Sequence, residues 1–302
     1  MNADKFSAVS FQWSVRGRTH RAFTLLEVLV AVSILAVMMT FLFNLLGSSV
    51  KLWEVGNKRI EAAQAARVGL NIIAQDLQGS FAGSVTSYTS SGTPVVNIAP
   101  FFANEDPDDD EVIDLGGGAQ NSPGSQQLYG VLASGNSTIP YKEFGYLCVF
   151  LDDDDGTLSM IGNRYYLVRK LANGDADGGN FFLRAASNEW MSDSSTFSPL
   201  IDNCLRVTFQ YYGNQTSAYG VPSWTTAGSW SPRDRLPLGV LVTVTVIDSK
   251  TAIKVADIKG DAALSNDEIN SIFLTTSPAA GVETLLRQGA VTMSRFIPLN
   301  RN

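Results

Sequence analysis

Histidine and cysteine are scarce in this chain of 302 residues. Its single histidine, His20, precedes a long apolar run, and none follows it. The chain after His20 therefore lacks the imidazole base of a Ser-His-Asp or Cys-His mechanism and a histidine ligand for zinc. Two carboxylates can also form an active site, but no pair stands out in the order of residues. We therefore predict that the protein is not an enzyme.

Runs of lysine and arginine are also missing. The whole chain has a net charge of −7, and an acidic body without a basic patch argues against direct binding of nucleic acid. The first 22 residues differ, because Lys5, Arg16, Arg18 and Arg21 stand against Asp4 alone. They carry a net charge of +3, which leaves −10 for the remainder. Basic residues before an apolar span place the N-terminus in the cytoplasm.

The longest apolar run extends over residues 23–46 and contains one acid, Glu27. About 20 helical residues cross a bilayer core of roughly 30 Å, so the run predicts a transmembrane helix. An ordinary secretory signal has a shorter apolar core, of roughly 7–15 residues, with a small-residue cleavage site behind it. Residues 47–49, Gly-Ser-Ser, are the only candidate for such a site.

Glu27 needs an explanation, because a carboxylate costs roughly 2.5–3.5 kcal/mol near the centre of a bilayer. The simplest alternative is that it reaches the headgroups and has no function. A cut between Ala22 and Phe23 would instead create an α-amine four residues before the acid. The amine of a neighbouring copy could then pair with Glu27, and a pair at 4 Å is worth about 4 kcal/mol at an effective dielectric of ~20. Glu27 is therefore a candidate assembly residue.

The segment Arg21-Ala-Phe-Thr-Leu-Leu-Glu-Val-Leu-Val-Ala31 resembles the cleavage and methylation signal of type IV prepilins and type II secretion pseudopilins. The resemblance implies that a membrane prepilin peptidase cuts between Ala22 and Phe23 and that the new N-terminal Phe23 is methylated. It also implies that Glu27 docks onto the N-terminus of a neighbouring subunit. The residue before the cut is usually Gly in that family and is Ala22 here.

The resemblance also implies partners and a location. The partners would be other pilins or pseudopilins, the prepilin peptidase and an inner-membrane assembly platform. The precursor would cross the inner membrane once, with the body in the periplasm, and would then enter a periplasmic pseudopilus or a surface pilus.

Helical spacing continues after the apolar run to about Gln78. Its apolar positions recur every three or four residues and should pack under the body: Leu52, Val55, Ala62, Ala66, Leu70, Ile73 and Leu77. Gly56 and Gly69 interrupt this helix. We interpret them as tolerated glycines in a packed helix, with local melting in a filament as the alternative.

The rest of the chain alternates turn-forming residues with strand-like runs. We expect strands at residues 128–132, 146–151, 164–171, 180–184, 205–212, 238–247 and 291–297. In the run 205–212, Leu205, Val207, Phe209 and Tyr211 should share one face. Short connections favour antiparallel pairing. The predicted fold is α+β and pilin-like: a long N-terminal helix packed on an antiparallel β-sheet head.

Three parts follow from this pattern: a leader (1–22), the N-terminal helix (23–80) with its transmembrane half (23–46), and a β-rich domain (81–302). Within the last part, residues 204–247 resemble the C-terminal half of J-type minor pseudopilins and W-type minor pilins. The body also resembles pilin-like proteins encoded in Verrucomicrobia cassettes. In the J-type group, minor pseudopilins form a tip complex that primes the filament.

Several acidic and polar segments read as solvated loops. They include the acidic run 105–111 in residues 84–126, a region low in apolar residues, and a cation site is the alternative there. Residues 265–269 could start a short helix. Asn173, Asp175 and Asp177 follow the first half of an EF-hand loop, although Arg184 stands where its glutamate belongs. The run 152–155 fits a calcium loop less well. Ca²⁺ is thus a possible ligand, and no other cofactor is expected.

Cys148 and Cys204 are the only cysteines. In an oxidising periplasm they can form a disulfide, and two buried free thiols are the alternative.

Two other functions remain open. One is a membrane-anchored periplasmic enzyme or carbohydrate-binding module with an uncleaved signal anchor, in which Trp190, Trp224 and Trp230 could line a cleft. The other is an adhesin displayed on a pilus. We expect a minor pilin or pseudopilin, a structural subunit that primes or caps a filament.

Overall fold

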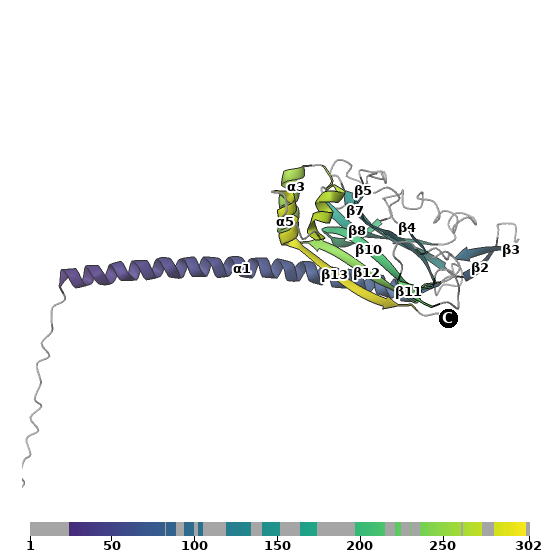
Figure 1. Cartoon of the computed structure of the whole chain (residues 1–302), viewed down its shortest axis with the longest axis horizontal. Helices are drawn as coiled ribbons and strands as arrows, with labels where there is room; N and C mark the ends of the chain where they lie inside the picture. Colours follow the sequence, from purple (N-terminus) through teal and green to yellow (C-terminus); the bar gives the residue numbers. More distant parts are fainter. Residues whose placement is uncertain are drawn as a thin grey trace, which may run out of the picture. The chain divides into compact units, whose positions relative to one another are not determined.

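A computed structural model describes residues 24–81, 83–88, 94–99, 102–104, 119–133, 141–151, 164–173, 197–214, 221–224, 230, 236–260, 262–273 and 281–299. The chain divides into two compact units, residues 1–54 and 55–302. The predicted α+β, pilin-like architecture is confirmed: a long N-terminal helix is followed by antiparallel sheets (Figure 1). The predicted limits of leader, helix and β-rich domain stay a prediction.

Helix α1 extends over Leu25–Gly79, in agreement with the predicted end near Gln78. Its buried face begins at Ala62 and continues through Ala66, Leu70, Ile73 and Leu77. The expected stripe was too long at its start, because Leu52 and Val55 are exposed. The alternation of buried and exposed positions after residue 61 therefore limits the packed part of α1 to its last five turns.

The larger sheet has seven strands, and every pairing in it is antiparallel. Its strands are β1 (Ser80–Phe81), β4 (Phe102–Asn104), β5 (Ala119–Asn121), β6 (Gln127–Ala133), β7 (Tyr141–Leu151), β8 (Arg164–Asn173) and β9 (Phe197–Asp202). The main path runs β1-β6-β7-β8-β9. The predicted strands at 128–132, 146–151 and 164–171 are confirmed by β6, β7 and β8.

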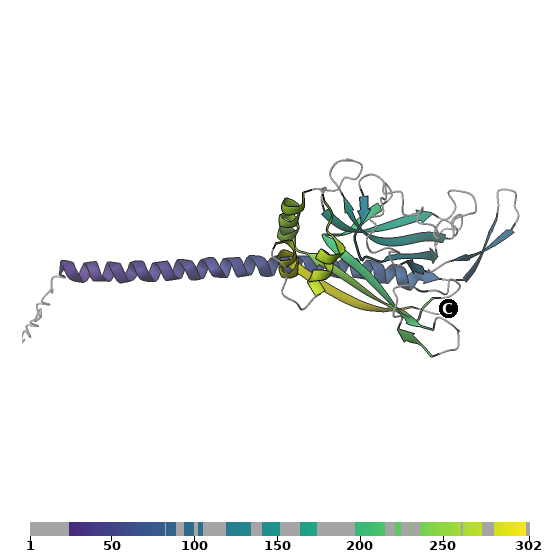
Figure 2. The same cartoon turned by 45° about the horizontal axis from the view of Figure 1, so that its top comes forward.

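A second sheet has four strands in the order β11-β10-β12-β13. They are β10 (Cys204–Gly213), β11 (Ser223–Trp224), β12 (Gly239–Ile247) and β13 (Ala290–Pro298). These confirm the predicted strands at 205–212, 238–247 and 291–297. The predicted strand at 180–184 lies outside the described residues. Figure 2 shows the teal strands of the larger sheet and the green to yellow strands of this one as separate layers.

One core joins the two sheets and the second half of α1. It contains Leu70 and Ile73 from α1, Phe144 and Tyr146 from β7, and alternate residues of β10 and β12. The alternation of core residues on β10 begins at Val207 and not at Leu205 as expected. A bulge between Cys204 and Arg206 places Cys204 in this core, while Leu205 packs in a different cluster. The predicted position of Leu205 on the face of Val207 was therefore wrong.

Three short helices follow β12: α3 (Ser249–Lys259), α4 (Asn266–Asn270), which leads into the 3₁₀ turn Ser271–Phe273, and α5 (Val282–Gly289). They bury some of their apolar residues, among them Val255, Ile269 and Leu286, in one cluster with Tyr165 and Ile247 of the two sheets. The Ser265–Glu268 capping box confirms the expected short helix at 265–269.

We did not predict the strands that the structure describes within residues 84–126. Strands β4 and β5 lie in this range, and β2 (Gly83–Tyr88) pairs with β3 (Pro94–Ala99) as a hairpin. Valine and isoleucine in β3 supply β-forming residues that the polar average of the region conceals. The acidic run at 105–111 lies outside the described residues.

Candidate functional site

The N-terminus of α1 is closed by a capping box. Thr24 precedes the first helical residue, and its hydroxyl accepts a hydrogen bond of 3.3 Å from the Glu27 backbone N–H. In return the Thr24 backbone N–H donates to Glu27 Oε2 at 3.3 Å, and the Thr24 hydroxyl also lies 3.4 Å from this oxygen. Such reciprocal bonds satisfy two backbone donors that a helix start leaves free. Glu27 therefore has a local role that we did not predict.

Four hydroxyl side chains in and just after the apolar run are satisfied within the helix. The hydroxyls of Ser33, Thr40, Ser48 and Ser49 each donate to the carbonyl four residues earlier, at 2.8–2.9 Å. In a bilayer such bonds remove the cost of a free donor. Glu27 differs because its charge needs a cation, and none pairs with it within the described ranges. Its carboxylate is exposed at the helix start.

Among the described residues, α1 is the one helix long and apolar enough, by length and composition, to cross a membrane. No residue in the most apolar 18-residue window of this helix is buried. This agrees with a membrane anchor at the N-terminus. Ala22 and Phe23, the predicted cleavage pair, lie outside the described residues, so the site of cleavage stays a prediction.

A buried ion pair holds the second half of α1 on the larger sheet. Arg169 of β8 donates from Nε and Nη2 to the two carboxylate oxygens of Asp76, at 2.8 and 2.6 Å. The Tyr146 hydroxyl donates to the same carboxylate. Burial, followed by the charge of Asp76, raises the pKa of Tyr146, so the phenol stays a donor. Sequence reasoning missed this cluster, since its members are 70 and 93 residues from Asp76.

Two further contacts join α1 to the second sheet and α5. Arg59 donates to the backbone carbonyl of Gln288, and Arg295 of β13 donates to the Asn71 side chain. Gly69 permits an especially close approach, because a Cβ there would lie 2.3 Å from Ile201 Cδ1. This agrees with our interpretation of Gly69 as part of a packed helix.

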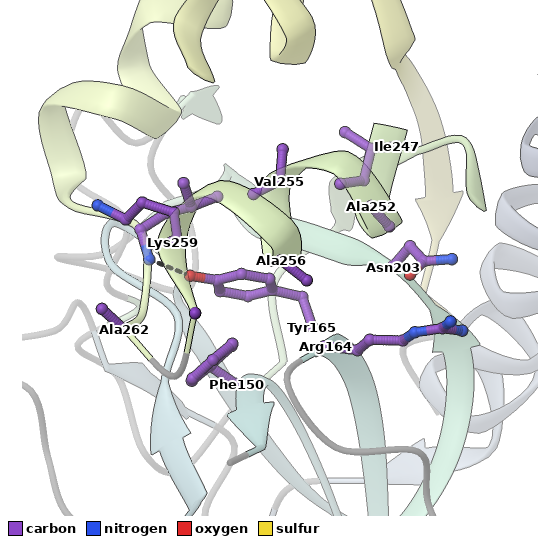
Figure 3. Close-up of a pocket in the computed structure, with 12 residues that line it drawn as sticks. Phe150, Arg164, Tyr165, Asn203, Ile247, Ala252, Val255, Ala256, Lys259 and Ala262 are labelled. Atoms are coloured by element: carbon purple, nitrogen blue, oxygen red, sulfur yellow. Dashed lines mark hydrogen bonds between the residues drawn. The ribbon is translucent and has the colours of Figure 1, made fainter. Parts of the chain in front are cut away.

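A small cavity lies where α3 covers the ends of the two sheets (Figure 3). Phe150, Tyr165, Ala252 and Val255 are among the residues that line it. The Tyr165 hydroxyl inside it accepts a hydrogen bond from the Leu264 backbone N–H. Its volume of about 20 Å³ has room for about one water molecule, whereas small-molecule sites measure roughly 300–1,000 Å³. This cavity therefore cannot take a metabolite.

Cys148 and Cys204 come together in the shared core. Cys148 lies on β7 and Cys204 on β10, both fully buried, and their sulfur atoms are 3.4 Å apart as free thiols. The structure thus brings the two predicted residues into contact across the sheets. The disulfide itself stays a prediction.

The other predicted ligands are not assembled. Asn173 ends β8, and Asp175 and Asp177 lie outside the described residues, as does the run 152–155. Within the described ranges no three His, Cys, Asp or Glu side chains gather as a metal site. A calcium site in these loops stays a prediction.

The tryptophans suggested for a carbohydrate cleft have different surroundings. Trp230 is buried against Tyr211, and Trp224 is exposed beside Tyr212 and Phe296. Trp190 lies outside the described residues. A cleft lined by Trp224 and Trp230 together is therefore not present.

The fold and the helix start define a class: a pilin-like protein with an apolar N-terminal helix and an antiparallel β head. The family model of the prokaryotic N-terminal methylation motif matches residues 17–43. This match includes Ala22, Phe23 and Glu27, and it supports the type IV pilin and pseudopilin family. No curated protein matches the chain.

Proposed function

We propose that this protein is a minor pilin or pseudopilin, a structural subunit of a type II secretion pseudopilus or a type IV pilus that primes or caps the filament. The observation that carries the proposal is the methylation motif at residues 17–43, which leads directly into one apolar helix with a single acid. The resemblance of residues 204–247 to J-type and W-type minor subunits supports the minor role.

The precursor spans the inner membrane once, with its N-terminus in the cytoplasm and its body in the periplasm. The prepilin peptidase cuts it between Ala22 and Phe23 and methylates Phe23. The exposed amine of a neighbouring subunit then provides the cation that Glu27 does not meet among the described residues of its own chain. Because the attraction between these groups is strong only away from water, it favours assembly in the membrane, where the helices of neighbouring subunits pack together.

The capping box gives this proposal a sharp test, since Glu27 has both a charge and a capping function. Glu27→Gln keeps a side-chain acceptor for the Thr24 backbone N–H but has no charge. Thr24→Ala removes one arm of the cap and keeps the charge. If Glu27 acts by docking, Glu27→Gln and Glu27→Ala both abolish incorporation, and Thr24→Ala assembles almost normally.

The readout is co-purification of the tagged, full-length variants with partner pilins from detergent-solubilised membranes. N-terminal processing is measured in the same samples, so that a failure to be cut is separated from a failure to assemble. Normal incorporation of Glu27→Gln together with loss of incorporation in Thr24→Ala would overturn the docking role and assign Glu27 to the helix cap.

A further inference from the structure

The two cysteines occupy the place where the two sheets share one core. Cys148 pairs with Leu167 in the larger sheet, and Cys204 pairs with Val246 in the smaller one. Leu167 and Val246 belong to the same core cluster as both cysteines. The two side chains therefore face each other from opposite layers, and their sulfur atoms are 3.4 Å apart.

We propose that Cys148 and Cys204 form a disulfide that joins β7 of the larger sheet to β10 of the smaller one. This goes beyond the proposed function, since it concerns how the head is held together and not what it assembles with. The sulfur atoms lie 3.4 Å apart, and a disulfide requires them to approach to about 2.05 Å.

The bulge at the start of β10 supports this proposal. Cys204 pairs with Val246 and Arg206 with Thr245, so that Leu205 is the extra residue. Without the bulge, strict alternation would turn Cys204 away from the face that Val207 and Phe209 share. A bulge of this kind redirects a side chain at a defined position. Here it places the thiol of Cys204 against Cys148.

The chemistry is thiol–disulfide exchange with a disulfide oxidant, such as an exported thiol oxidase or oxidised glutathione. One cysteine thiolate attacks a sulfur of the oxidant and releases the first thiol. The second cysteine thiolate then attacks the resulting mixed disulfide and releases the second thiol. Two protein thiols lose two electrons and two protons, and the oxidant is reduced to two thiols.

Burial determines when this exchange can take place. Both side chains are fully buried, and burial, together with the hydrogen bond and charge of Cys204, raises the pKa of the Cys148 thiol despite a hydrogen bond with Ser125. The folded protein therefore offers little thiolate and no access to an oxidant. The bond forms before the two sheets close over it, and afterwards the same burial protects it from reductants.

The first experiment counts thiols in the full-length protein. Cells that make it from its own genes are quenched in acid, and the denatured protein is treated with a maleimide-linked polyethylene glycol before electrophoresis. We expect no adduct without reduction and two adducts after it. The variants Cys148→Ser and Cys204→Ser should each give one adduct in either case. Two adducts on the unreduced protein, or a disulfide-linked dimer, would overturn the proposal.

The second experiment tests protection and stability on the purified, detergent-solubilised chain, refolded with oxidised glutathione. Dithiothreitol should reduce the bond only in the presence of a denaturant. For the 56-residue separation of the two cysteines, reduction should lower the Tm by roughly 5–15 °C. The Tm of the variant Cys148→Ala/Cys204→Ala should not respond to the reductant. An equal Tm for reduced and oxidised wild-type protein would count against a structural crosslink.

The refolding experiment does not depend on export or on processing. A protein that still begins at Met1 but forms the bond would contradict the proposed function and leave this inference intact. A methylated Phe23 on a chain with two free thiols would support the proposed function and contradict this inference.

Discussion

Asp76 on α1 and Arg169 on β8 form a bidentate ion pair between the helix and the larger sheet, with N–O distances of 2.6 and 2.8 Å. The side chains are 7% and 24% exposed, so water screens the pair only in part. Arg169 presents two parallel donors to one carboxylate, which is the geometry that a guanidinium forms best. This pair fixes the register of the helix against the larger sheet as well as its position.

Removal of the Asp76 charge should destabilise the head strongly. Asp76→Asn leaves a largely buried guanidinium without a counter-ion, and we expect a loss of roughly 2–4 kcal/mol in the free energy of unfolding. Tyr146→Phe, which removes only one hydrogen bond to the same carboxylate, should cost about 1–2 kcal/mol. Urea unfolding of the full chain in detergent, followed by tryptophan fluorescence, measures both. Equal losses for the two variants would mean that the charge is unimportant.

Gly56 and Gly69 of α1 should respond to alanine in opposite directions. Nothing lies within 4 Å of a Cβ at Gly56, so Gly56→Ala should stabilise the helix by about 1 kcal/mol. A Cβ at Gly69 would lie 2.3 Å from Ile201, so Gly69→Ala should cost about 1–3 kcal/mol despite its better helix propensity. Thermal unfolding of the two matched variants checks this. Stabilisation by both would show that the contact with β9 is looser than described.

Glu268 makes the stability of the short helices depend on pH. Burial by itself would raise the pKa of its carboxyl, but the hydrogen bond from the Ser265 backbone N–H and the interaction with Lys259 lower it below the ordinary 4.5. The carboxylate is the stabilised form, so its contribution is complete above pH 4.5 and is lost as the pH falls through the lower, folded-state pKa.

The matched control for this pH dependence is Glu268→Gln. It retains an acceptor for the capping box with Ser265 and loses the attraction to Lys259. At neutral pH the variant should be less stable by about 0.5–1 kcal/mol. The difference from wild type should shrink below pH 4.5, as the wild-type carboxyl becomes protonated. A difference that stays constant down to the acid limit of folding would remove Glu268 as the cause.

Ala22 should slow the processing of the precursor. The residue before the cut is Gly in most of the family that the N-terminus resembles, and Ala22 adds one methyl group that the peptidase must accommodate. Ala22→Gly should therefore increase the rate of cleavage, whereas Ala22→Leu should block it. Pulse-chase labelling in the native cells measures the ratio of precursor to mature chain. If Ala22→Gly is cut no faster than wild type, the alanine is fully compatible with the peptidase.

Much of the fold could be predicted from local pattern alone. The apolar run and the spacing up to Leu77 predicted α1, because a helix repeats every 3.6 residues and its buried face is visible in the sequence. The valine-rich run 238–247 predicted β12 for a similar reason. The same spacing did not show where packing begins. Leu52 and Val55 continue the pattern but are exposed, and the buried face starts only at Ala62.

Features that depend on residues far apart in the sequence, or whose local sequence signal is weak, were not predicted. Helix α3 begins at Ser249 behind the N-cap Asp248, whose carboxylate accepts from the backbone N–H groups of Lys250 and Thr251. Aspartate before a helix is a readable signal, but the helix has little apolar periodicity to support it. The bulge at Cys204 cannot be read from a run that alternates correctly through Tyr211. Asp76 and Arg169 are 93 residues apart, and only the tertiary fold makes them partners.

The candidate site also combines a feature that was predicted from the sequence with one that was not. Glu27 stood out because it is the one acid in an apolar run, and its proposed partner lies on another chain. Its bonds to Thr24 follow the Thr-x-x-Glu pattern of a capping box and could have been recognised from the sequence. The helix cap and the proposed docking would use the same carboxylate, which is why the Glu27→Gln variant is informative.

The most direct test of the account is the mass of the protein isolated from its own cells, with sequencing of its N-terminal peptide. Cleavage between Ala22 and Phe23 followed by methylation predicts a chain that begins with N-methylated Phe23. That terminus is the cation proposed to meet Glu27 of a neighbouring subunit. A protein that still begins at Met1 would have no amine at that place, and the filament function would be contradicted.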